Sequence, residues 1–150
     1  MGDLKRSDDE QALVDLAAKV LPAGGFGNLA SDIVIKEGRG GRVWDVSGNE
    51  YVDFLLGSGP MLVGHGNEEV LAAVQEQVQR GTTFFANNEA GIRLAAEIVD
   101  AVACADKVRF VSTGSEATFY AMRLARAHRG RDKILKFEGG YHGMSDYALM

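Results

Sequence analysis

The stretch 107–122, KVRFVSTGSEATFYAM, constrains the fold more than any other part of the sequence. Its apolar residues before position 112 predict a buried strand, and a turn of small polar residues, 112–115, follows directly. Thr113 and Glu116 have the S/T-x-x-E spacing of a capping box, so we expect a helix to begin at this serine–glycine turn. A strand that enters a helix through small residues leaves several backbone N–H groups without a partner.

Unpaired N–H groups, hydroxyls and the positive end of a helix dipole together favour a bound anion, above all phosphate. The turn is not a Walker P-loop, because no lysine follows at the required place, and G-x-G-x-x-G is absent as well. Two interpretations remain open from the spacing alone. The turn is either a phosphate site or a capped helix start that binds no ligand.

A second glycine-rich segment, the glycine loop GGYHG at 139–143, follows another predicted strand at 133–138. Tyr141 can stack on a flat heterocycle, although a tyrosine capping a core beside a surface histidine, His142, is the alternative. After residue 60 the predicted order is helix, helix, strand, helix, strand, which indicates α/β layers with a largely parallel sheet. Ligands of such sheets bind beyond the carboxyl ends of strands, so we expect both turns to face one pocket.

The composition excludes several classes of protein. The 150 residues are 46% hydrophobic and 25% charged, enough for one ordinary domain with a core. A net charge of −5 without a basic tract argues against a nucleic-acid partner, and no apolar run reaches the ~18–20 residues of a membrane span. The single cysteine, Cys104, excludes an internal disulfide, and the charged N-terminus has no signal region. We therefore expect a cytoplasmic protein.

Apolar periodicity and capping residues predict four helices, at 8–20, 68–80, 89–103 and 115–128. The segment 32–56 predicts β structure, with a glycine turn at its first bend and a hairpin turn at 47–49. The glycine-rich loop that follows contains Ser58 and His65. His65 has no neighbour at metal-ligand spacing, so a role in a turn or core is expected, and no metal site is predicted. The sequence ends directly after a glycine loop, which predicts the front part of a longer polypeptide.

Three blocks in one order are more specific than any single motif. They are the glycine loop at 22–28, VWDVSGNEYVDFLLGSGPMLVGH at 43–65, and the long block 108–143 that contains both turns. Together they closely resemble the N-terminal part of class III aminotransferases, which depend on pyridoxal 5′-phosphate. Within this family, the three blocks resemble most the group of glutamate-1-semialdehyde 2,1-aminomutase and its aminotransferase relatives.

This resemblance implies an α/β protein with the type I pyridoxal-phosphate-dependent transferase fold. Residues 1–56 are then an N-terminal helix and β segment that packs with the small domain, and 57–150 are the first, incomplete part of the large, mostly parallel-sheet domain. It also implies a homodimer that acts on a small-molecule amino donor and a carbonyl acceptor. The Schiff-base lysine and the aspartate at the pyridine nitrogen are expected beyond Met150. No catalytic residue is therefore assigned, and the 150 residues are not expected to be active alone.

The family motifs also imply residue roles. N/S-S/T-G-T/S-E-A matches 112–117 and implies phosphate contacts, while G-G-Y/F-H-G matches 139–143 and implies a stacking aromatic with a supporting histidine. The implied cofactor-binding residues are Thr113, Gly114, Ser115, Tyr141 and His142. Ser58 matches the S-x-G loop and is expected on the substrate side.

Two departures from the aminomutase pattern favour an aminotransferase. The run 22–32, PAGGFGNLASD, lacks the arginine that aminomutases place after these glycines, and Gly59-Pro60 stands where they have a tryptophan before the glycine. The predicted function is transfer of an amino group from an amine or amino acid to a keto acid or aldehyde. The alternatives are the aminomutase itself and, from another class, a truncated binding module without catalytic activity.

Overall fold

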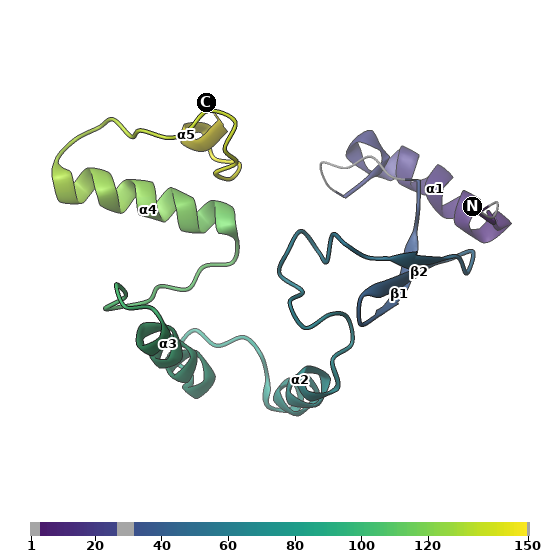
Figure 1. Ribbon diagram of the computed structural model, residues 1–150, viewed down its shortest axis with the longest axis horizontal. Helices are drawn as coiled ribbons and strands as arrows, with labels where there is room; N and C mark the ends of the chain where they lie inside the picture. The colour runs from purple at the N-terminus through teal and green to yellow at the C-terminus, as the bar shows by residue number, and fades with distance from the viewer. Residues whose placement is uncertain (1–3, 27–31, 150) are drawn as a thin grey trace. The chain divides into compact units, whose positions relative to one another are not determined.

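The computed structural model describes residues 4–26 and 32–149 (Figure 1). It divides into two compact units, Met1–Thr83 and Phe84–Met150, each of which is described by itself. The predicted division after Leu56 refers to domains of a longer protein and stays a prediction. Among the described residues, no helix is long and apolar enough to cross a membrane.

The described part of the first unit contains one small sheet and two α-helices. Its elements in chain order are α1 (Asp8–Val20), a 3₁₀ turn η1 (Pro22–Gly24), β1 (Ile35–Arg39), β2 (Arg42–Asp45), β3 (Glu50–Val52) and α2 (Glu68–Arg80). The strands form an antiparallel sheet in the order β1-β2-β3. The two hairpins confirm the predicted turns at the glycines after β1 and at 47–49.

The third strand is shorter than the predicted run 50–56, because Asp53 turns the chain away from the sheet. Its carboxylate accepts hydrogen bonds from the backbone N–H groups of Leu55 and Leu56, both at 2.9 Å. A side-chain acceptor for consecutive N–H groups favours a turn over a ladder. β3 therefore ends at Val52.

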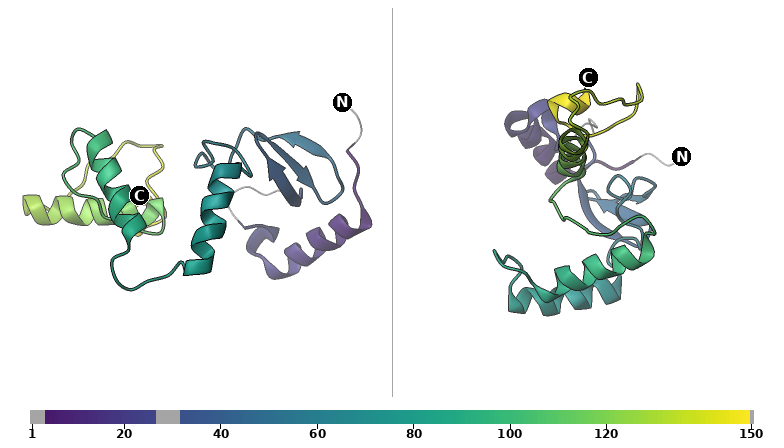
Figure 2. Two further views of the ribbon diagram at one scale, coloured as in Figure 1. Left: turned by 90° about the horizontal axis from the view of Figure 1, so that it is seen from below. Right: turned by 90° about the vertical axis from the view of Figure 1, so that its left-hand side faces the viewer.

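Helix α1 is joined to the sheet region by a buried carboxylate that the sequence did not single out. Glu10 is 1% exposed and accepts hydrogen bonds from the Val34 N–H, at 2.9 Å, and from the Ser47 hydroxyl. The N–H of Ser7, the N-cap of α1, donates to the Ser47 hydroxyl at 2.8 Å. These bonds hold the start of α1 beside the strands, an arrangement visible in Figure 2.

The second unit contains the helices α3 (Glu89–Ala101), α4 (Gly114–Arg129) and α5 (Asp146–Leu149). Asn88 caps α3 by accepting a hydrogen bond from the Gly91 N–H at 2.8 Å. Gly130, with a left-handed φ of 60°, ends α4 as its capping position predicts. The predicted helices of this unit are thus confirmed to within two residues at their ends.

The predicted strands at 107–111 and 133–138 are not formed in the described residues. Both segments are free of helix, but neither belongs to a hydrogen-bonded ladder. A strand exists only through hydrogen bonds to a neighbouring strand, and the described part of the second unit offers none. The prediction of these two strands is wrong for this structure, and the sheet present is antiparallel and lies at 35–52.

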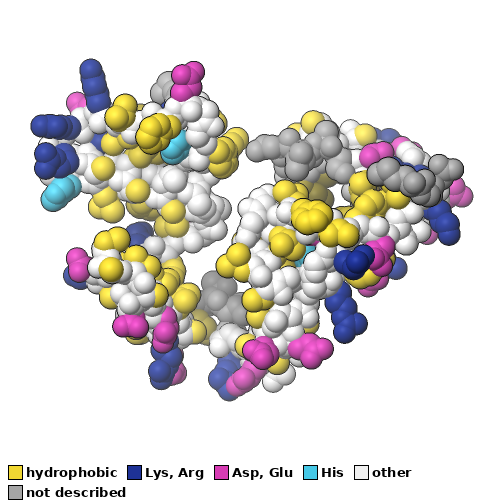
Figure 3. All heavy atoms as spheres, in the orientation of Figure 1, with side chains coloured by type: hydrophobic (Ala, Val, Ile, Leu, Met, Phe, Trp, Pro, Cys, Tyr) yellow, Lys and Arg dark blue, Asp and Glu magenta, His cyan; other side chains and the backbone are white. Residues whose placement is uncertain are grey.

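The hydrophobic core is much smaller than the composition predicts. Among the described residues, the buried apolar side chains are Val43 and Ala148. The apolar stripes of the helices remain exposed, with Val74 of α2 at 52% and Ile92 of α3 at 59%. Groups of hydrophobic side chains are accordingly visible at the surface of both units in Figure 3. An amphipathic helix buries its stripe only against another layer. Among the residues that the structure describes, α2 and α3 pack on no other element of their own unit.

Candidate cofactor-binding site

The serine–glycine turn 112–115 and the glycine loop 139–143 lie against each other at the start of α4. The Met144 N–H donates to the Ser115 hydroxyl at 3.1 Å, and the Thr118 hydroxyl donates to the His142 carbonyl at 2.7 Å. These bonds bring the two segments together. The cavity of about 730 Å³ beside the glycine loop does not include 112–115, so the prediction that both turns face one pocket is not confirmed.

The first turn of α4 is capped as the motif predicts, with one difference. The Thr113 hydroxyl accepts a hydrogen bond from the Glu116 N–H at 3.1 Å. The Glu116 carboxylate accepts from Ser112 N–H at 2.7 Å, one residue before the N-cap that a standard capping box would use. In the described part of the chain, the N–H groups of Gly114 and Ser115 have no acceptor. These two donors, at the positive end of the helix, suit an anion.

Both hydroxyls of the turn remain able to donate to such an anion. Thr113 and Ser115 each use their oxygen as an acceptor, from Glu116 and Met144 respectively, and a hydroxyl that accepts still carries its own proton. Two hydroxyl protons and two backbone N–H groups therefore converge on one helix end. That donor set fits the phosphate that the motif implies.

The last residue of the glycine loop must be a glycine for two reasons. Gly143 is buried and has a left-handed φ of 95°. A Cβ at this position would lie 2.8 Å from the Ser115 Cα and 2.9 Å from its Oγ. The close approach of the two segments thus depends on the missing side chain at position 143.

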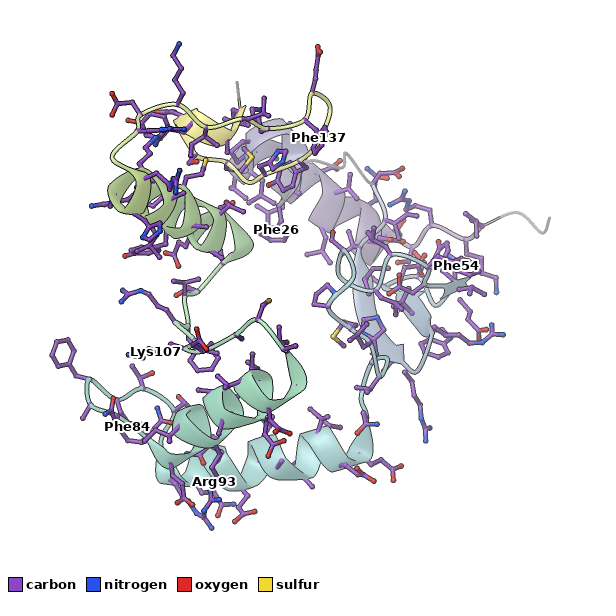
Figure 4. All side chains as sticks on the ribbon, turned by 60° about the vertical axis from the view of Figure 1, so that its left-hand side comes forward. Phe26, Phe54, Phe84, Arg93, Lys107 and Phe137 are labelled. Atoms are coloured by element: carbon purple, nitrogen blue, oxygen red, sulfur yellow. The ribbon has the colours of Figure 1, made fainter. Side chains whose placement is uncertain are left out.

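The two residues of the loop that are not glycine differ in exposure. Tyr141 is 72% exposed, so its ring is available to a ligand. His142 is half-buried, and its Nδ1 lies 2.7 Å from the Gly140 carbonyl within the same loop. This contact lies within the glycine loop itself, and the supporting role that the motif implies for His142 stays a prediction. Phe137, labelled in Figure 4, precedes the loop and is 87% exposed.

Ser58 belongs to the first unit, in the loop 53–66. It is exposed with a φ of 68°, and Leu56 has a φ of 45°, so two residues other than glycine adopt left-handed conformations there. Such conformations cost roughly 1–3 kcal/mol each and persist only where the surroundings hold them. Strained residues of this kind cluster at functional sites.

The loop 53–66 is held at its ends by an aspartate and a histidine. The His65 Nε2 lies 2.7 Å from the Asp53 Oδ2, and Gly40 and His65 exchange backbone hydrogen bonds of 2.8 and 2.9 Å. The hydrogen bond from His65, followed by that from the Leu56 N–H, lowers the pKa of Asp53 below its ordinary value despite some burial. This arrangement confirms the turn role expected for His65.

Sequence reasoning missed Thr118, which joins α4 to the glycine loop. A signal was present, because Thr118 follows Ser115 by three residues and therefore lies on the same helical face. The glycine loop at 22–28 falls partly on residues 27–31, which lie outside the described residues.

Comparison with known proteins assigns the family. The family described as aminotransferase class-III matches residues 26–150, so the chain belongs to the class III aminotransferases. Glutamate-1-semialdehyde 2,1-aminomutase of Persephonella marina is 48% identical over 118 residues, which are 79% of this chain and 28% of that protein. The chain therefore spans less than a third of the length of this relative.

Solved structures agree with this assignment. An omega-transaminase from Sphaerobacter thermophilus matches 96% of this chain with a TM-score of 0.89 and 32% identity, over 34% of its own length. A transaminase described with PLP bound matches 97% of this chain with a TM-score of 0.90 and 32% identity, over 35% of its length. The predicted type I pyridoxal-phosphate-dependent fold is confirmed, and pyridoxal phosphate is the cofactor of this family.

Proposed function

We propose that the full-length protein transfers amino groups with bound pyridoxal 5′-phosphate. The observation that carries the proposal is the hydrogen bond from the Met144 N–H to the Ser115 hydroxyl, which joins the two family motifs. This bond brings the start of α4 next to a loop with an exposed aromatic ring. A phosphate ester of a flat heterocycle needs both features in one site.

In this proposal each residue has a separate task. The N–H groups of Gly114 and Ser115 and the hydroxyls of Thr113 and Ser115 bind the phosphate. Tyr141 stacks on the pyridine ring, and His142 holds the loop in place. When bound, the cofactor supplies two things: an electron-withdrawing ring, and the carbonyl that takes up the amino group. Fixing the phosphate and the ring orients that carbonyl before the reaction, which lowers the entropic cost of the chemical step.

Substitution of Ser115 tests the phosphate site. Ser115→Glu places a carboxylate where the phosphate binds, so the full-length variant should retain no cofactor and show no cofactor absorbance in the visible range. Ser115→Ala removes one hydrogen bond to a charged group, worth about 1.5–3 kcal/mol, and should weaken binding by roughly tenfold or more. Undiminished visible absorbance of the Ser115→Glu variant would refute the phosphate assignment.

An aminotransferase is the function we favour, with a primary amine or amino acid as donor and a keto acid or aldehyde as acceptor. Two features of the sequence support an aminotransferase. Gly59-Pro60 stands where aminomutases have a tryptophan before the glycine, and the run 22–32 lacks the arginine of the aminomutases. The aminomutase is the second candidate, supported by the 48% identity to the Persephonella marina protein.

Two assays on full-length protein separate these candidates. Glutamate 1-semialdehyde supplied alone should be converted only by an aminomutase. An amine donor with a keto-acid acceptor should react only if the protein is an aminotransferase. Conversion of the semialdehyde without any acceptor would reverse our preference.

The surroundings of the site complete the proposal. A substrate-side role is proposed for Ser58, supported by its family motif and by its exposed position with a left-handed φ in the loop 53–66. The proposed location is the cytoplasm, which the single cysteine supports. The protein forms a homodimer, supported by the exposed apolar stripes of the helices, which need a covering layer.

A further inference from the structure

The Thr118 hydroxyl makes a hydrogen bond to a segment outside its own helix, the glycine loop. This hydroxyl lies 3.0 Å from the Ser115 carbonyl, the usual local acceptor of a helical threonine, and 2.7 Å from the His142 carbonyl, 24 residues away. A hydroxyl has one proton, and the shorter distance favours donation to His142. The side chain is half-buried between the two segments.

The bond belongs to a set of three successive contacts between the glycine loop and the start of α4. The carbonyl of His142 accepts from Thr118, Gly143 packs on the Ser115 backbone, and the N–H of Met144 donates to the Ser115 hydroxyl. Tyr141 comes directly before this set. The backbone next to its ring is thus held by a side chain whose hydroxyl lies near the Ser115 and His142 carbonyls. Among the described residues, this hydroxyl makes no bond to the N–H groups or hydroxyls of the serine–glycine turn.

We propose that Thr118 is a positioning residue, which holds Tyr141 at the correct place for the cofactor ring while leaving the phosphate contacts to 112–115. This inference rests on the proposed function. The Thr113–Glu116 capping bonds do not involve Thr118, so the phosphate half of the site can persist without it. Loss of the Thr118 hydroxyl should therefore weaken recognition of the ring selectively.

The experiment compares two probes on full-length protein. Pyridoxamine 5′-phosphate has both ring and phosphate, and as an amine it cannot condense with a protein lysine, so its affinity reports non-covalent contacts alone. Inorganic phosphate reports the phosphate half. Thr118→Val removes the hydroxyl and keeps the branched shape, and Thr118→Ser keeps the hydroxyl as the matched control.

We expect Thr118→Val to weaken the binding of pyridoxamine phosphate about tenfold, which corresponds to the loss of one aromatic contact. The affinity for inorganic phosphate should stay within about twofold. Thr118→Ser should remain within about twofold of the unaltered protein for both probes. Faster amide exchange at Met144 in the cofactor-free Thr118→Val variant should accompany the loss, because the loop is then held at one point fewer. Should Thr118→Val not fold, Thr118→Ala, with a better helix former, gives the same comparison.

Equal weakening of both probes by Thr118→Val, or no change in either, would overturn the positioning role. Failure of the proposed function has a different signature. Ser115→Ala would then leave the affinity for inorganic phosphate unchanged, whatever the Thr118 variants do.

Discussion

Gly143→Ala should separate the glycine loop from the start of α4 more selectively than the substitution of any polar residue. Gly143 has a φ of 95°, and its absent Cβ would lie 2.8 Å from the Ser115 Cα. A left-handed conformation costs a residue with a Cβ about 1–2 kcal/mol. The clashing atom belongs to the backbone of α4 and cannot rotate away, so the loop must move. That movement breaks the Met144–Ser115 hydrogen bond, at about 1 kcal/mol more.

The same loop contains a matched control. Gly139 also has a left-handed φ, 74°, but nothing lies within 4 Å of the position that a Cβ would take there, so Gly139→Ala should incur only the conformational cost. We expect a loss of about 2–3 kcal/mol in the free energy of unfolding for Gly143→Ala and about 1–2 kcal/mol for Gly139→Ala.

Denaturant unfolding of both full-length variants measures these losses, and titration with pyridoxamine phosphate measures the site. Gly143→Ala should weaken the binding of this ligand about tenfold or more, since the ring contact and the position of the Ser115 hydroxyl are both disturbed. Gly139→Ala should weaken the binding less. If the two variants lose equal stability and equal affinity, the close approach at Ser115 has no consequence, and the reasoning is refuted.

Three further predictions concern single contacts. Glu10→Ala leaves two donors without their acceptor and should lower the free energy of unfolding by about 2–4 kcal/mol in denaturant titrations, while Glu10→Gln, which keeps one acceptor oxygen, should lose less. The lowered pKa of Asp53 means that the stability from its bond to His65 is fully present above the ordinary value of 3.8 and is lost as the pH falls through the lower folded value. The amide groups of the loop 53–66 should therefore be less protected from exchange in strong acid, and Asp53→Asn should remove this dependence on pH. Protection that does not change with pH in the unaltered protein would contradict this prediction. Thr113→Ala should cost about 1 kcal/mol of helix capping, measured by thermal denaturation, and Thr113→Ser almost nothing, so equal losses would exclude the cap.

The ends of the helices were predictable because their causes are local. Asn67, Asn88 and Thr113 each accept a hydrogen bond from an N–H three residues later, and that spacing is visible in the sequence. Gly81 and Gly130 end α2 and α4 by adopting positive φ, which glycine does without strain. The hairpin at 47–49 belongs to the same class of local signal.

Strands and core were less predictable, since both need partners elsewhere. The segments 107–111 and 133–138 have the composition of strands, yet a ladder forms only with a neighbouring strand, and the described residues of that unit provide none. The apolar stripes of α2 and α3 were correctly recognised, but burial requires a facing layer, and composition does not show whether one is present.

By itself, the sequence determined the capped helix start at Thr113, the glycines at 139–143 and the family motifs that connect them with a phosphate and an aromatic ring. Only the tertiary structure decided that the Met144 N–H meets the Ser115 hydroxyl, that Gly143 has no room for a side chain, and that Thr118 reaches the His142 carbonyl. The physical reason is distance along the chain. A cap acts over three or four residues, whereas these contacts join groups 24 to 29 residues apart, whose meeting depends on the path of the backbone between them.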